Sequence, residues 1–292
     1  MRKHLSPSEL ILNADGSIYH LHLLPEYIAD TVITVGDQNR AKRISDLFDD
    51  LEFEIVNREF STYTGRYKGK RISVCSTGIG TDNIDIFLNE LDAVVNIDLK
   101  ERKVKSELKS LNIIRVGTSG SIQKDIPVGS LVASTFAVGT DNLAYYYNYK
   151  FTKEERDIAL SMESHFQLPS HFSKPYIIGS SPLLLSSIGV GMFHGITTTA
   201  TGFYAPQGRS LRATVSDNWK QNLISFSHSD LRITNLEMET SGLYTLSKVL
   251  GHHCISCSAI LANRVDNSFA DNPIMVVDNL IEVVLERISK MN

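Results

Sequence analysis

Four short segments carry residue types that bind anions, hydroxyl groups or flat polar rings. In the first, Gly36 follows a β-branched run and precedes Arg40, with the sequence Gly-Asp-Gln-Asn-Arg. Glycine lets the backbone approach an anion closely, the amides at a helix N-terminus attract negative charge, and arginine donates two hydrogen bonds to phosphate. This pattern indicates a phosphate site, although an ordinary glycine turn before a helix has the same appearance.

The second segment places a charge inside an apolar run. Arg115 lies within the apolar segment 113–116, which we expect to be a strand that opens into a glycine turn over residues 117–121. A buried charge is costly unless it is paired, so Arg115 needs either a structural carboxylate or a bound phosphate. Thr118 and the neighbouring amides are suited to complete a phosphate cradle. No Gly-Lys-Ser/Thr follows, so this segment is not a Walker loop.

The remaining two segments suggest binding of a sugar and of a base. Glu237 and Glu239 lie at an expected strand-to-helix junction, where they either complement the helix dipole or, for Glu239, accept bonds from sugar hydroxyls. Gln207 supplies a donor and an acceptor, Arg209 supplies donors, and Phe203 can stack on a ring. An imide-type heterocycle such as uracil requires such a set, although a turn that starts a helix is the alternative.

Composition narrows the class of protein. The chain has 292 residues, of which 42% are hydrophobic and 21% charged, and the net charge is −4. These values exclude a disordered, collagen-like or disulfide-stapled chain, and the acidic balance argues against a general nucleic-acid binder. No apolar run reaches the length of a membrane span and no export signal is recognisable, so we expect a cytoplasmic protein with three free cysteines.

Short apolar runs alternate with longer mixed segments, which predicts an α/β fold. Strands are expected at Thr31–Val35, Phe53–Tyr63, Arg71–Cys75, Asn112–Val116, Ser130–Val138, Tyr176–Ile178, Met192–Thr198 and Cys254–Ala262. Helices are expected after Gly36 and at Asp82–Val95, Thr152–Phe166 (with Thr152 as the N-cap), Thr240–Leu250 and Ile274–Ile288.

Three other features favour structural roles. The charged run Leu99–Lys109 is predicted to be a solvated helix or a surface insertion rather than a partner site. The tyrosine cluster Ala144–Tyr149 favours packing or a subunit contact over a role facing substrate. Cys254 and Cys257 form a Cys-x-x-Cys within a strand, where alternation puts the thiols on opposite faces, so we expect neither a zinc site nor a redox pair.

Taken together, these segments resemble the uridine phosphorylases of the nucleoside phosphorylase I superfamily. The resemblance runs from Tyr19 to about Ile288 and rests on seven ordered segments, which are 35–40, 58–60, 76–80, 114–121, 203–209, 237–239 and 263–264. It implies an α/β fold with a single domain, in which a twisted mixed β-sheet is flanked by helices. The domain would span residues 1–292, with 1–18 as an N-terminal extension and 96–110 as a surface insertion.

The resemblance also implies roles for particular residues. Phosphate would be bound by the Gly36 amide, Arg40, Arg115 and Thr118, with Arg58 donated by a neighbouring subunit. Ribose would be held by Glu239, the Met238 backbone and a donated His20. The base would be read by Gln207 and Arg209 beside Phe203. Within these sets Arg115, Glu239 and Arg209 would be the catalytic residues.

The implied reaction is reversible phosphorolysis of uridine, which gives uracil and ribose 1-phosphate in pyrimidine salvage or catabolism. A broader pyrimidine or purine nucleoside phosphorylase is the first alternative, because purine-specific relatives tend to carry an aspartate near Asn263 and this chain has Asp266. A hydrolytic nucleosidase is a further alternative. A catalytically silent nucleoside-binding or assembly protein is the alternative of another class.

The resemblance further implies a homo-oligomer, a dimer or a hexamer of dimers, with active sites shared between subunits. No cofactor is expected besides phosphate as co-substrate. Bacterial members hold a monovalent cation such as K⁺ between subunits, and Glu59 and Ile79 match that pattern, while Asn83 replaces a serine. At the phosphate turn Gln38 and Asn39 replace the Pro-Asp of the bacterial form, but Gly36 and Arg40 are kept.

Overall fold

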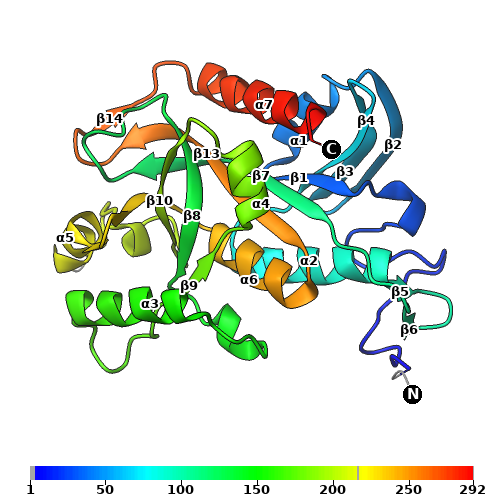
Figure 1. The fold of residues 1–292 in the computed structure, drawn as a ribbon, viewed down its shortest axis with the longest axis horizontal. Coiled ribbons are helices and arrows are strands. Elements are labelled where there is room, and N and C mark those ends of the chain that lie inside the picture. Colours follow the sequence, from blue (N-terminus) through cyan, green and yellow to red (C-terminus); the bar gives the residue numbers. More distant parts are fainter. Residues whose placement is uncertain (1–3, 216, 292) are drawn as a thin grey trace.

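One mixed sheet runs through the whole molecule, and helices cover both of its faces (Figure 1). The computed structural model describes residues 4–215 and 217–291. Along the sheet the strands follow the order β11 (Ser227–His228), β12 (Leu231–Glu237), β10 (Phe193–Thr199), β8 (Leu131–Gly139), β13 (His253–Asn263), β7 (Asn112–Ser121), β1 (Thr31–Val35), β4 (Lys70–Ser76), β3 (Phe60–Tyr67) and β2 (Asp50–Asn57). Two short strands join it, β14 (Ser268–Phe269) beside β13 and β9 (Tyr176–Gly179) beside β8.

Part of this sheet closes into a ring. Strand β12 pairs in parallel with β10 and also in antiparallel fashion with the end of β7. Because β10 pairs with β8, β8 with β13 and β13 with β7, five strands form a closed circuit. Closure satisfies the backbone groups that a free edge would expose. It also brings the end of β12 beside the end of β7.

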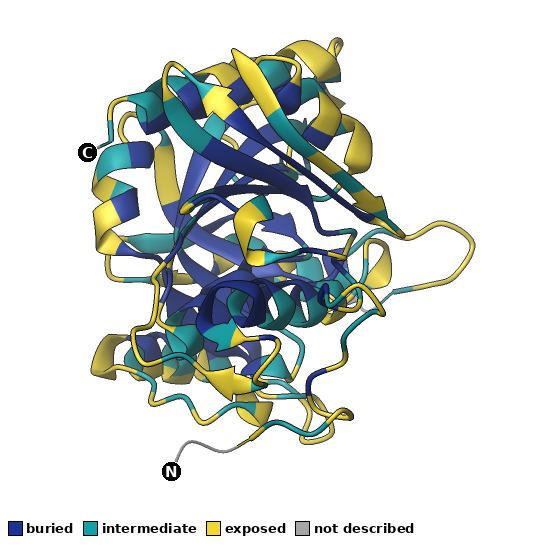
Figure 2. Ribbon diagram, turned by 90° about the vertical axis from the view of Figure 1, so that its right-hand side faces the viewer, coloured by how far each residue is buried: buried dark blue, intermediate teal, exposed yellow. Residues whose placement is uncertain are grey.

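The helices are α1 (Gln38–Ser45), α2 (Thr81–Asn96), α3 (Lys153–Phe166), α4 (Pro182–Ile188), α5 (Asp217–Ser225), α6 (Thr240–Leu250) and α7 (Pro273–Ser289). Helices α1, α4 and α7 contribute to one apolar cluster, α2 and α6 to a second, and α3 and α5 to a third. Figure 2 shows the central strands between these layers in dark blue, as buried residues. Over the residues described, no helix has both the length and the apolar character needed to cross a membrane.

The expected fold class is confirmed, and most expected elements are present. Helix α6 has the predicted bounds, and α3 begins after Thr152, which forms a capping box with Glu155. Two expectations are wrong, and a third is correct only in part. The strand Phe53–Tyr63 is in fact the hairpin of β2 and β3, which reverses at Arg58 with φ +56°. Residues 117–121 continue strand β7 rather than forming a turn, since they pair with β13 and β12.

The charged run at 99–109, predicted to be a solvated helix or a surface insertion, contains no helix. Its Lys103–Val104 forms β6, which pairs with β5 (Ile97–Asp98) in a two-residue ribbon. The run lies at the surface, as the alternative of an insertion required. Helix propensity is overridden here because Arg102 donates hydrogen bonds to the carbonyls of Leu5 and Ser6 and ties the ribbon to the N-terminal segment.

The cysteines and tyrosines behave as structural residues. Cys75, Cys254 and Cys257 are free and buried, and burial raises the pKa of each thiol to about 12. Cys254 belongs to the core cluster beside α2 and α6, and Cys257 to the cluster beside α7, which confirms that they lie on opposite faces of β13. The Tyr147 hydroxyl, from the tyrosine cluster, is hydrogen-bonded by Asn89 of α2.

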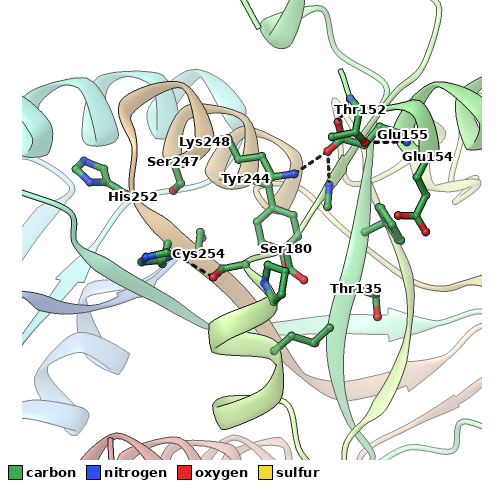
Figure 3. Close-up of a pocket in the computed structure, with 16 residues that line it drawn as sticks. Thr135, Thr152, Glu154, Glu155, Ser180, Tyr244, Ser247, Lys248, His252 and Cys254 are labelled. Atoms are coloured by element: carbon green, nitrogen blue, oxygen red, sulfur yellow. Dashed lines mark hydrogen bonds and ion pairs between the residues drawn. The ribbon is translucent and has the colours of Figure 1, made fainter. Parts of the chain in front are cut away.

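A buried carboxylate joins α3 to the rest of the fold. Glu155 accepts hydrogen bonds from Lys248 Nζ at 2.7 Å, Gly179 N at 3.0 Å, Thr152 N at 2.8 Å and the Tyr149 hydroxyl at 3.0 Å. Figure 3 shows this group at one side of a cavity of about 460 Å³ that is separate from the candidate site described below. Burial alone raises the pKa of Glu155, but the bonds from Lys248, Gly179 and Thr152 outweigh it and lower the pKa overall.

Replacing Glu155 by Ala is expected to destabilise the protein by about 3 kcal/mol, because Lys248 and two backbone amides lose their acceptor. The folded-state pKa lies below the ordinary value of 4.5, so the contribution of Glu155 is present above that pH and is lost as the pH falls through the folded-state pKa. Chemical denaturation between pH 3 and 7, roughly the range of carboxyl titration, should therefore show a shallower acid loss for Glu155→Gln than for the wild type. Glu154→Ala, which removes an exposed neighbouring carboxylate, is the control. A loss of stability as large in Glu154→Ala as in Glu155→Ala would contradict this role of Glu155.

Candidate active site

The antiparallel pairing of β12 with β7 carries two carboxylates to Arg115. Leu236 lies opposite Gly120, so the residues that follow run back along β7. Arg115 Nη2 donates to Oε2 of Glu239 at 2.5 Å and lies 3.4 Å from Oε2 of Glu237. Of the two partners considered for Arg115, a structural carboxylate is therefore present.

The two glutamates have different tasks. Glu237 accepts the hydroxyl of Thr199 at 2.7 Å and the amide of Thr240 at 3.0 Å, so it caps the first turn of α6. Glu239 instead accepts the amide of Gly80, from the loop between β4 and α2, at 3.0 Å. The dipole interpretation is correct for Glu237, whereas Glu239 faces the loops that follow the strands.

Arg115 keeps one donor without an acceptor. The residue is 5% exposed, and its Nη1 is buried with no hydrogen-bond partner in the part of the chain described. Burial lowers the pKa of Arg115, but Glu239 and Glu237 outweigh this and raise the pKa overall. Leaving a buried charged donor unpaired costs free energy, so the geometry favours an acceptor bound next to Nη1.

A second guanidinium contacts β7 at the residue that follows Arg115. Arg40 of α1 donates from Nη1 to the Val116 carbonyl at 3.4 Å, and its Nη2 lies 3.7 Å from Asp37. Burial lowers the pKa of Arg40, Asp37 opposes this, and the charge of Arg115 lowers it further. Because Arg40 and Arg115 repel each other, an anion bound beside both would be stabilised.

The segment predicted to read a base forms one unit after β10. Gln207 is 2% exposed, and Arg209 hydrogen-bonds its Oε1 and donates to the Phe203 carbonyl at 2.7 Å. The Arg209 guanidinium also lies 3.8 Å from the centroid of the Phe203 ring, which is half-exposed. Burial lowers the pKa of Arg209 to about 10, with Arg264 adding to the effect. A single 3₁₀ turn at Ala205–Gln207 replaces the helix start that was the alternative.

Arg264 fixes this unit to the sheet, a role that sequence reasoning did not assign. It donates to the carbonyls of Gln207 at 3.1 Å and Gly208 at 3.2 Å. Its own amide donates to Ser121 at the end of β7, and its side chain packs beside Gly120. The base-reading segment is thereby attached to the strand that carries Arg115 and the half-buried Thr118.

His20 and Arg58 make their side-chain contacts with other residues. His20 Nδ1 lies 2.6 Å from Oε1 of Glu90, whose carboxylate also accepts the amides of His20 and Leu21. Arg58 lies exposed over the ring of Tyr19, 5.4 Å from its centroid. Glu90 was not foreseen, since a glutamate on an amphipathic helix gives no distinguishing signal.

The residues matched to a cation pattern lie near one another. The Glu59 and Asn83 side chains both pack against Gly78, and the adjacent Ile79 is 64% exposed. Carboxylate, carbonyl and carboxamide oxygens are ligands that a hard cation accepts, so the donor set fits one. Within the described ranges, no three His, Cys, Asp or Glu residues cluster so as to hold a metal.

Comparison with known proteins assigns the family. Residues 30–289 match the model of the Phosphorylase superfamily. The chain belongs to this superfamily. It is 32% identical over 255 residues to a uridine phosphorylase of Thermococcus kodakarensis, covering 87% of this chain and 80% of the relative. It is 28% identical over 270 residues to a DeoD-type purine nucleoside phosphorylase of Bacillus cytotoxicus, covering 91% and 97%.

The fold of this chain is similar to that of a solved relative. The structure of a Trypanosoma brucei nucleoside phosphorylase, described as showing uridine phosphorylase activity, has a TM-score of 0.88 with this chain. Sequence identity is 28%, and the match covers 97% of this chain and all of the other. The superfamily therefore accounts for nearly the whole architecture, including β7, which carries Arg115, and the junction of β12 and α6, which carries Glu239.

Gly117 provides a direct test of the Arg115 donor. A Cβ there would lie 1.7 Å from Nη1 of Arg115, so Gly117→Ala is expected to displace the guanidinium without changing any charge. Phosphate-dependent turnover should fall by at least about 100-fold, on the scale of losing one preorganised donor. Gly120→Ala is the control on the same strand, because its Cβ would make only an ordinary 3.5 Å contact with Arg264. Equal activity of the two variants, both folded by circular dichroism, would contradict the placement of Nη1.

Proposed function

We propose that this chain is a pentosyltransferase that converts uridine and inorganic phosphate to uracil and ribose 1-phosphate, reversibly. The observation that carries the proposal is the buried, unpaired Nη1 of Arg115, together with Arg40, which hydrogen-bonds the carbonyl of the adjacent Val116. The uridine phosphorylase named above at 32% identity supports the choice of nucleoside, as does the activity described for the similar solved structure.

In the reaction, a phosphate oxygen forms a bond to the anomeric carbon while the glycosidic carbon–nitrogen bond breaks and its electrons leave with the base. Arg40, Arg115, Thr118 and the Gly36 amide would hold phosphate close to that carbon, which removes part of the entropic barrier. No side chain is required as a nucleophile. The related transition state of glycoside cleavage has oxocarbenium character, so a nearby carboxylate favours it.

Glu239 is suited to orient ribose. Its carboxylate accepts from Gly80, Arg115 and Met238. A carboxylate has about four acceptor positions, so one remains for a sugar hydroxyl. The Met238 backbone would lie beside the same sugar.

Gln207 and Arg209 would bind the imide edge of uracil. As negative charge gathers on the departing base, their donors stabilise the transition state more than the ground state. The Arg209 guanidinium stacks on the Phe203 ring. We therefore expect the base to lie beside these two side chains rather than between them.

We propose a homo-oligomer whose subunits share active sites. His20 is held by Glu90, and Arg58 is exposed to solvent, which is compatible with both residues serving ribose and phosphate in an adjoining subunit, as the family resemblance implies. Glu59, Ile79 and Asn83 would hold a monovalent cation near that contact, where it would neutralise carboxylate charge. Phosphate is a substrate, and no further cofactor is proposed. A cytoplasmic location stays a prediction.

A broader nucleoside phosphorylase is the second candidate, favoured by the purine relatives. Asp266 is exposed, and its amide donates to Asn263 Oδ1. In the part of the chain described, Asp266 makes no hydrogen bond or ion pair with Gln207 or Arg209, which favours the pyrimidine assignment.

Base release from uridine and inosine, each with and without phosphate, tests the proposal. Uracil is expected only when uridine and phosphate are both present, and Arg115→Ala should abolish it. Release without phosphate would indicate a nucleosidase, and release from inosine would indicate the broader or purine specificity. No turnover of either nucleoside would leave a binding or assembly role.

Gln207→Ala tests the base assignment separately. The variant should raise the KM for uridine or lower kcat by about 10- to 100-fold, because a buried donor–acceptor pair is lost, while the KM for phosphate should change little. Steady-state kinetics with each substrate varied distinguishes the two. A parallel loss of apparent affinity for phosphate would contradict the assignment.

A further inference from the structure

The turn that carries Arg58 needs an external support. Arg58 has φ +56°, a left-handed conformation that a non-glycine residue adopts only when its surroundings fix it. It lies at the reversal between β2 and β3 and is exposed to solvent. The orientation of its side chain therefore depends on what holds the turn.

Gln38 supplies one such support from a different part of the chain. Its Nε2 donates to the carbonyl oxygen of Arg58 at 2.7 Å, across 20 positions of sequence. Gln38 is the first residue of α1, directly after Asp37, whose side chain caps that helix, and two residues after Gly36. The bond thus joins the phosphate turn of a subunit to the arginine that the same subunit would donate to its partner.

The opposite side of the turn is braced as well. Asn57 donates to the carbonyl of His20 at 2.7 Å, and the Tyr19 ring meets both the His20 ring at 4.7 Å and the Arg58 guanidinium at 5.4 Å. His20 and Arg58 are therefore held in one cluster through Tyr19 and Asn57. Gln38 is the contact that connects this pair to the subunit's own α1.

We propose that Gln38 is a positioning residue for Arg58 and acts on phosphate binding in the partner's active site rather than in its own. This inference rests on the shared site of the proposed function. Gln38 touches no substrate. It fixes the turn from which Arg58 reaches the anion, so its loss should weaken the use of phosphate and leave uridine binding largely unchanged.

Two substitutions remove the donor with little disturbance. Gln38→Met keeps the length of the side chain. Gln38→Pro suits the first helical position, where the backbone N–H has no intrahelical acceptor. Each should raise the KM for phosphate by about five-fold, the factor that corresponds to one hydrogen bond, with the KM for uridine and kcat nearly constant.

Mixed oligomers show in which site the effect occurs. One subunit carries Arg115→Ala, which silences its own site, and the other keeps the live site; the pair is purified through two affinity tags. Gln38→Pro placed in the silenced subunit should raise the phosphate KM of the live site, because that subunit donates Arg58 to it. The same change placed in the live subunit should have no effect, because its Arg58 serves the silenced site.

Arg58→Ala in the silenced subunit is the reference for action between subunits. If it weakens phosphate use and Gln38→Pro does not, or if Gln38→Pro acts only from the live subunit, the positioning role is wrong while the proposed function stands. If Arg58→Ala has no effect from the silenced subunit, both the shared site and this inference fail. If wild-type protein shows no phosphorolysis at all, the proposed function itself fails.

Discussion

The candidate site depends on the buried ion pair between Arg115 and Glu239. A guanidinium in the middle of an apolar sheet is tolerable only with a carboxylate in contact, and Glu239 makes that contact at 2.5 Å. The pairing uses one end of the guanidinium and leaves the other end free. The same interaction therefore allows Arg115 to be buried and reserves a donor for an anion.

The topology of the sheet makes this ion pair available. Arg115 and Glu239 are far apart in sequence, and they meet because β12 closes the ring of strands against β7. A register shift of one residue would turn Glu237, the last residue of β12, to the wrong face and move the junction that carries Glu239. The caps that Glu237 forms with Thr199 and Thr240 hold the junction in register, so the structural glutamate positions the functional one.

Local sequence predicted much of this fold because strand and helix periodicity survive in the structure. Helix α6 has the predicted bounds and buries most of its residues, and Thr152 caps α3 as predicted. The failures occur where local signals are weak or misleading. Arg58 does not predict a left-handed turn, since glycine or asparagine usually occupies such positions. Glycines at 117 and 120 suggested a turn, whereas Gly117 is needed in a strand because the Arg115 guanidinium lies against it.

The candidate site, like the fold, was predicted in part: the residue types were informative, but the contacts between distant segments were not. The residue types at Gly36, Arg40, Arg115, Gln207 and Glu239 predicted binding of phosphate and a nucleoside, and the family resemblance joined them into one site. Contacts between distant segments, such as Arg264 with the Gln207 carbonyl or Glu90 with His20, could not be read from spacing. Such contacts depend on tertiary structure, and they are the ones that fix the orientation of the binding groups.

The three buried thiols have a practical consequence. With pKa values near 12 they hold almost no thiolate at neutral pH, so an alkylating reagent reacts with them only after the surrounding core opens. Cys254 and Cys257 lie in different apolar clusters on the two faces of β13. The chain thus contains its own pair of chemical reporters, and the order in which they become alkylated reveals which layer of helices leaves the sheet first.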